Sequence, residues 1–300
     1  MTDAPLAAPA PAASSARRRG RLSLRLLLPT VPFFAYVALF LVLPTAIVVV
    51  SAFQSTTGAF TLGNLGVLAE PAVRSAALWS IGLSAISAVT GAVIGALLAY
   101  AVSTARPDGL LRRVVVAGCS VLAQFGGVML AFAFTATFGA TGSITTLIRS
   151  WTGVRIDPSW IYDFRGLLLV YAYFQIPLMV IVFLPALDGI RPQWREATET
   201  LGGSTWTYWR RVAGPILAPA FISSTLLLFA NAFSAYATAA ALISQQNPLL
   251  ALQIRGFITS EVVQGTTHAA QVVAMLMVVI VAVVMTLYAL LQRRASRWLG

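Results

Sequence analysis

Side chains capable of acid–base or nucleophilic chemistry are scarce in this sequence of 300 residues. It holds nine acids, one histidine (His268), one cysteine (Cys119) and no lysine. The absence of lysine excludes a P-loop lysine, a Schiff base and a lysine general base on this chain. A single cysteine and a single histidine exclude a disulfide framework and a Cys/His zinc cluster within one chain. We therefore expect no catalytic residues, no metal site and no cofactor.

Two of the acids form a pair suited to recognition. Glu196 and Glu199 lie three residues apart, which places both carboxylates on one face of a helix. The segment around them is otherwise rich in arginine, so two exposed carboxylates there indicate a surface for a protein partner. The alternative is a solvated helix on which Glu199 pairs only with Arg195, an interaction worth about 0.3 to 0.5 kcal/mol.

Uncharged polar residues within apolar stretches are candidates for a translocation path, because polar groups inside a membrane often mark one. Asn231 and Ser234 belong to a polar stripe at helical spacing that Thr238 continues. For each candidate the alternative is an interhelical hydrogen bond, worth about 0.6 kcal/mol. No carboxylate lies deep in these stretches, which argues against a proton- or sodium-coupled carrier. The candidates are Gln124, Tyr171, Gln175, Asn231, Ser234 and Tyr236.

The elements that carry these residues are predicted to be membrane-spanning helices. Hydrophobic residues make up 58% of the chain, charged residues make up 10%, and the mean hydropathy is +0.84. A bilayer core needs roughly 20 apolar residues per helix, and no strand-period pattern of a barrel occurs. The predicted fold class is therefore an all-α, polytopic membrane protein. Its six spans are residues 30–53, 77–101, 114–138, 166–189, 214–243 and 269–292.

The arginines predict the orientation of these spans. With the N-terminus in the cytoplasm, fifteen of the 20 arginines lie on the cytoplasmic side and five on the other. This bias satisfies the positive-inside rule and places both termini in the cytoplasm. Residues 1–28 are expected to form a disordered, Arg-rich cytoplasmic tail, and residues 29–300 the transmembrane domain. The net charge of +11 thus anchors loops, and we expect no nucleic-acid partner.

The cytoplasmic segment of residues 190–213 is predicted to form a helix-turn-helix. Pro192 suits the first turn of a helix, where its missing N–H costs nothing. Gly202 and Gly203 then end that helix. Ser204 is a good N-cap for a second, separate short helix over residues 205–212.

Two further patterns predict helix packing and an external element. Gly91 and Gly95 in the second span form a small-residue row that lets helices approach closely. The external loop of residues 139–165 is expected to include a short amphipathic helix around Ile144 to Trp151. Its aromatic residues indicate a membrane-interface belt or, alternatively, a docking surface for an external protein.

The segment from Glu196 to Pro215 resembles the EAA motif of the membrane subunits of ATP-binding-cassette (ABC) importers. That motif reads E-A-A, three residues, G, nine residues, I-x-L-P. Gly202 and Val212 keep both spacings, and the segment lies between the fourth and fifth of six spans, where this family carries it. The mild departures are Thr198 for Ala, Val212 for Ile and Gly214 for Leu.

This resemblance implies a type I ABC importer permease fold and a transport subunit that is not itself an enzyme. It implies that residues 196–205 form a coupling helix that sits in a groove on a separate cytoplasmic ATPase. The implied partners are an ABC ATPase dimer, a second permease subunit of different sequence, and an external solute-binding protein, at a bacterial inner membrane. The implied coupling residues are Glu196, Ala197, Thr198, Glu199, Gly202, Gly203, Ser204 and Pro215.

The resemblance also bears on the solute. The stretches ETLGGSTW and FANAFSAYATA are most similar to the branch of the family that serves polyamines, ferric iron, thiamine or 2-aminoethylphosphonate. Within this branch the sequence favours a spermidine- or putrescine-like solute. The competing class of protein is a stand-alone secondary transporter or channel, which would have no ATPase partner.

Overall fold

A computed structural model describes residues 30–55, 57–106, 108–153, 157–242, 249–259 and 266–299. The predicted tail of residues 1–28 lies outside the described residues. The described part of the chain is almost entirely helical, and within it six helical runs are long and apolar enough to cross a membrane, in agreement with the predicted fold class. The runs are Val31–Ala52, Pro71–Ser103, Gly127–Thr152, Phe164–Asp188, Thr205–Phe233 and His268–Arg293.

The chain divides into two compact units, residues 1–47 and 48–300. In the first unit, α2 (Val31–Val37) continues through a π-helical turn, η2 (Ala38–Val42), into the start of α3 (Leu43–Ala52). The π turn ends two residues before Pro44. Proline has no N–H and its ring clashes with the carbonyl four residues earlier in a regular helix, so the wider turn lets this apolar helix continue.

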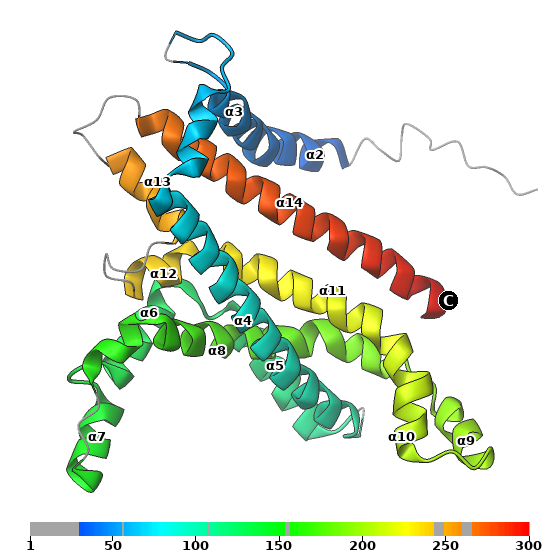
Figure 1. Cartoon of the computed structure of the whole chain (residues 1–300). Coiled ribbons are helices and arrows are strands. Elements are labelled where there is room, and N and C mark those ends of the chain that lie inside the picture. The colour runs from blue at the N-terminus through cyan, green and yellow to red at the C-terminus, as the bar shows by residue number, and fades with distance from the viewer. Residues whose placement is uncertain are drawn as a thin grey trace, which may run out of the picture. The chain divides into compact units, whose positions relative to one another are not determined.

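Four long helices frame the second unit: α4 (Pro71–Ser103), α8 (Phe164–Asp188), α11 (Gly214–Phe233) and α14 (Thr266–Leu299). Helix α4 packs against both α8 and α11, and α11 packs against α14 (Figure 1). Small residues make this packing close. The buried face of α4 includes Ser80, Ser84, Ser87, Ala88, Gly91, Ala92, Gly95 and Ala99.

Two glycines of α4 confirm the predicted small-residue row. A Cβ atom on Gly91 would lie 2.6 Å from the Cβ of Gln175, and one on Gly95 would lie 2.5 Å from the Cβ of Met179. Real Cβ atoms do not approach this closely, so α4 and α8 can pack as they do only without side chains at these two positions.

The prediction of one helix over residues 114–138 is wrong. Helix α5 (Leu110–Gln124) ends at Phe125, and α6 (Gly127–Phe138) begins two residues later. Gly127 has φ +72°, a left-handed conformation that glycine adopts without strain. Apolar character continues across such a break, so hydropathy does not detect it.

The predicted fifth span, residues 214–243, is also interrupted. Helix α11 ends at Phe233, and α12 (Tyr236–Leu242) starts after Ser234 and Ala235. This second break lies beside the first, because α6 packs against α12 and the Gly127 N–H donates to Thr238 Oγ1 at 3.0 Å. The paired breaks form one irregular region within the helical frame.

Shorter elements complete the second unit. They are η3 (Gly63–Ala69), α7 (Ser143–Thr152), η4 (Pro158–Tyr162) and α13 (Leu250–Thr259). Helix α7 confirms the short helix predicted in the loop of residues 139–165, and Leu147 and Trp151 are exposed on it. Cys119 is buried, as a small apolar residue would be.

Candidate functional site

Helix α9 (Pro192–Thr200) begins at Pro192 and ends before the glycines, as its residue types predict. The helix implied over residues 196–205 is wrong, because residues 201–204 form the turn between α9 and the next helix. Pro192 occupies the first turn, and the helix closes in a Schellman motif. In this motif the Gly203 N–H donates to Thr198 O at 2.9 Å and the Gly202 N–H donates to Glu199 O at 3.0 Å. Gly202 has φ +77°, so the turn itself requires a residue that tolerates the left-handed region.

The second helix departs from the prediction. Helix α10 (Thr205–Tyr208) starts at Ser204, whose Oγ accepts the Thr207 N–H at 3.3 Å. It does not end before Pro215. It continues through a π-helical turn, η5 (Trp209–Ala213), directly into α11. As in the first unit, the wider turn precedes a proline and accommodates its missing N–H.

Residues 192–208 therefore form a compact α9–α10 hairpin on the end of a continuous helical rod. The rod runs from Thr205 to Phe233, which includes the membrane-spanning part of α11. Figure 1 shows α9 and α10 together beyond the first turns of α11, at the opposite end of the unit from α7, α12 and α13. A displacement of the hairpin is thus transmitted directly to α11.

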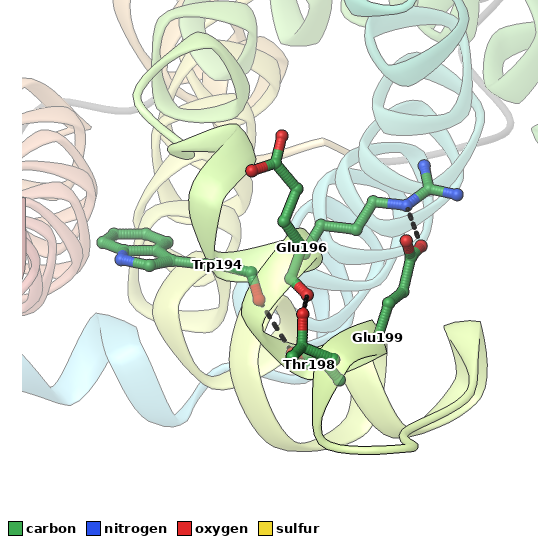
Figure 2. A network of polar contacts seen from close by, with 6 residues as sticks. Trp194, Glu196, Thr198 and Glu199 are labelled. Carbon is green, nitrogen blue, oxygen red and sulfur yellow. Dashed lines mark hydrogen bonds and ion pairs between the residues drawn. The ribbon is translucent and has the colours of Figure 1, made fainter.

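The two carboxylates of α9 have different surroundings (Figure 2). Glu199 Oε1 accepts a hydrogen bond from Arg195 Nε at 3.0 Å, the local pair considered as the alternative above. This contact raises the pKa of Arg195, first through the hydrogen bond and then through the charge of Glu199. Glu196 is exposed and lies apart from this pair. It makes no ion pair within the described part of the chain, so its charge is available to another molecule.

Sequence reasoning missed two exposed apolar residues on the same hairpin. Leu201 is 88% exposed and Trp206 is 72% exposed, on either side of the glycine turn. Large apolar side chains that stand in the open beside a charged group are typical of protein contact surfaces. Large apolar residues in a largely polar loop segment could have indicated this exposed surface from the sequence. We refer to Glu196, Leu201 and Trp206 together as the hairpin surface.

An ion pair holds the end of α8 that leads into this hairpin. Arg112 of α5 pairs with Asp188, the last residue of α8. The Arg112 side chain is 16% exposed and the Asp188 side chain 39% exposed, so water still screens part of the pair. Since α5 also packs along α8, the connection from α8 into α9 is anchored on the membrane side.

Two of the six predicted path residues make hydrogen bonds between helices. Gln175 is fully buried, and its Nε2 donates to the Leu228 carbonyl at 3.1 Å. Tyr171 is also buried, and its hydroxyl donates to the Ala235 carbonyl at the break between α11 and α12. For both residues the structure favours the alternative, a hydrogen bond between helices.

The other four path candidates are exposed and flank the two helix breaks. Gln124 is the last residue of α5, and Asn231, Ser234 and Tyr236 surround the break after α11. Lipid does not tolerate exposed irregular backbone, which occurs at membrane depth only against protein or a water-filled cavity. The four side chains therefore border the part of the spans that is least suited to face lipid.

Comparison with protein families identifies the chain. A family model described as binding-protein-dependent transport system inner membrane component matches residues 91–297, well over half of the sequence. The chain belongs to this family. The match includes the α9–α10 hairpin and both helix breaks of this inner membrane component.

Named relatives of this inner membrane component are transport permeases. It is 24% identical over 203 residues to the sulfate transport system permease protein CysT of Escherichia coli (strain K12), across 67% of the chain and 69% of the relative. It is 27% identical over 117 residues to the molybdenum transport system permease protein ModB of the same strain. The latter match covers 39% of the chain and about half, 49%, of the relative.

A solved structure shares the fold of this inner membrane component. A bacterial ABC transporter involved in the import of the acidic polysaccharide alginate contains a chain that superposes with a TM-score of 0.70. The superposition covers 91% of this chain and 96% of the other, at 16% sequence identity. The predicted ABC importer permease fold is therefore confirmed.

Proposed function

We propose that this chain is the membrane-spanning permease subunit of an ATP-driven ABC importer in a bacterial plasma membrane. Its partners would be a second permease, a cytoplasmic ATPase dimer and an external solute-binding protein. The observation that carries the proposal is the α9–α10 hairpin, a glycine-capped helix with an unpaired exposed carboxylate, joined without a break to a membrane helix. The fifteen-to-five arginine bias supports placing this hairpin and both termini in the cytoplasm.

The hairpin would act as a rigid lever. A separate ATPase would receive Leu201 and Trp206 in an apolar depression and pair an arginine with Glu196. When the ATPases close around ATP, the bound hairpin moves with them as a rigid body. The continuous rod from Thr205 to Phe233 would carry that movement to the break at Ser234, where the frame is free to bend.

The solute passage would run along the interface with the second permease. The exposed polar residues at the two breaks, Gln124, Asn231, Ser234 and Tyr236, are the proposed lining. Irregular backbone facing such a passage finds water or polar groups as partners, which lipid cannot supply. The competing class is a stand-alone transporter or channel. Such a protein has no ATPase partner that would contact the exposed hairpin surface.

Co-purification tests the class. The complex extracted in mild detergent should contain an ATPase subunit, and its ATP hydrolysis should rise when the loaded solute-binding protein is added. A purified chain that transports solute in vesicles with no ATPase and no ATP contradicts the proposal and supports the stand-alone class.

The solute is a finer part of the proposal. The motif resemblance favours a polyamine-like compound, carried as a polycation. An oxyanion is a second candidate, favoured by the similarity to a sulfate permease and by the lack of any carboxylate deep in the predicted spans. Uptake of labelled spermidine and of labelled sulfate distinguishes the two solutes when each is measured with an excess of the other compound, unlabelled. A polyamine importer takes up spermidine, and sulfate does not compete.

The proposed lining predicts opposite results for two polar residues. Asn231→Leu should lower uptake about fivefold, because losing one hydrogen bond to a passing solute costs about 1 kcal/mol. Gln175→Met should leave uptake unchanged and alter stability by about 1 kcal/mol or less, since it also removes a buried Oε1 that lacks a partner. Solute uptake by vesicles and the thermal unfolding temperature are measured for both variants. A loss of uptake with Gln175→Met alone contradicts the assignment.

A further inference from the structure

An apolar groove lies between three helices at the end of the unit that carries the hairpin. Its volume is about 530 Å³, and it is lined by residues of α4, α8, η5 and α11. Leu97 and Tyr100 contribute from α4, Phe183 from α8, and Trp209 and Phe221 from the rod. Leu97 is 65% exposed, so the groove opens to the outside of the chain.

The groove is elongated along the membrane helices. Trp209 and Phe221, which both line it, lie twelve residues apart on the rod, or about 18 Å at the usual helical rise. Its outer end is marked by Tyr100 and Trp209, whose rings meet edge to face at 5.3 Å. Aromatic residues with one polar atom are typical of the membrane interface. The groove therefore runs from the interface into the depth of the hydrocarbon layer.

Positive charge surrounds the outer end. Arg210 and Arg211 follow Trp209 directly and are exposed. Neither arginine lines the groove itself, but both adjoin Trp209, which does.

Two of the acids at this end are paired, whereas Glu196 of α9 is exposed and makes no ion pair among the described residues. Glu199 is paired with Arg195, and Asp188 is paired with Arg112. Arg210 and Arg211, exposed and next to Trp209 in the chain, make no ion pair among those described, so their charge is available at the groove's outer end.

We infer that this groove binds one anionic phospholipid, with an acyl chain between α4, α8 and α11 and its phosphate on Arg210 and Arg211. A long, narrow and apolar space fits an unbranched chain, and arginine binds phosphate oxygens through several N–H donors. A polar solute finds few partners in such a space. This inference needs only the membrane location, so it stands apart from the proposed ATPase coupling.

Tryptophan quenching tests occupancy directly. The full-length chain, with Trp209 as its only tryptophan, is placed in phosphatidylcholine nanodiscs that contain a small fraction of phosphatidylglycerol. Brominated phosphatidylglycerol should quench Trp209 far more than the same fraction of brominated phosphatidylcholine. Equal quenching by both lipids shows ordinary annular contact, and absence of quenching shows that protein covers the groove. Either result overturns the inference.

A second measurement keeps the natural tryptophans. Native mass spectrometry should show phosphatidylglycerol retained on the unmodified chain. Ala218→Phe, which fills the groove, should remove it, whereas the matched change Ala282→Phe on the exposed face of α14 should not. Arg210→Gln with Arg211→Gln should weaken retention on the order of tenfold, and Arg106→Gln should not. If phosphatidylglycerol is still retained after Ala218→Phe and after the double change of Arg210 and Arg211, the assignment is refuted.

Discussion

Replacing Glu196 by arginine is expected to lower solute-stimulated ATP hydrolysis of the assembled importer more than about tenfold, because reversing a charge at a docking surface costs about 2 kcal/mol or more. The folding of the chain itself should not change. Glu196 is exposed, and no side-chain hydrogen bond or ion pair of its carboxylate occurs among those described; Thr200 Oγ1 donates only to its backbone carbonyl. The measurement is ATP turnover by the purified complex with and without loaded binding protein.

The neighbouring carboxylate provides the matched control. Glu199→Gln removes only the exposed pair with Arg195, an interaction worth about 0.3 to 0.5 kcal/mol. Its coupling and stability should therefore stay close to those of the unmodified protein. Full stimulation with Glu196→Arg, in a complex that still contains the ATPase, would show that α9 does not couple through this carboxylate.

Replacing Gly95 by alanine is expected to destabilise the membrane domain by about 1 to 3 kcal/mol, the usual cost of overpacking a close contact. The new Cβ would lie 2.5 Å from the Cβ of Met179 and 2.6 Å from the Ile176 carbonyl oxygen. Backbone cannot yield as a flexible side chain does, so α4 and α8 would have to separate. Thermal unfolding in detergent and the yield of folded protein report the effect.

Gly82→Ala on the same helix is the control. A Cβ at Gly82 meets nothing within 4 Å, and alanine favours a helix interior over glycine by about 0.5 to 1 kcal/mol. Gly82→Ala should therefore be neutral or stabilising. If both substitutions shift the unfolding temperature alike, the contact between α4 and α8 is looser than described here.

Local chemistry explains what could be predicted about the α9–α10 hairpin. Pro192, Gly202 and Ser204 each impose a backbone rule that holds whatever surrounds them, so the bounds of α9 and the start of α10 follow from residue types alone. The continuity of α10 into α11 does not follow in this way. A proline ordinarily argues for a break, and only the π turn at Trp209–Ala213 allows the helix to pass Pro215.

The interrupted spans show the limit of hydropathy. Phe125 and Gly126 are as compatible with a membrane helix as their neighbours, and Ser234 and Ala235 contain no helix breaker. The breaks are held by contacts from other segments, such as the hydrogen bonds from Gly127 to Thr238 and from Tyr171 to Ala235. A window along one segment contains no information about such partners.

The sequence by itself determined the class of protein, because 58% hydrophobic residues and only 10% charged residues require a multi-span membrane protein. Composition suffices there because transfer into lipid depends on residue type and not on neighbours. Only the tertiary structure shows which polar residues are buried or paired and which stay exposed. Gln175 and Asn231 look alike in sequence, but Gln175 is buried and bonded to the next helix, whereas Asn231 is exposed. Glu196 and Glu199 also look alike, but Glu199 is paired with Arg195 four residues before it. A hydrogen bond or ion pair depends on what lies opposite in space, and only the folded chain defines that.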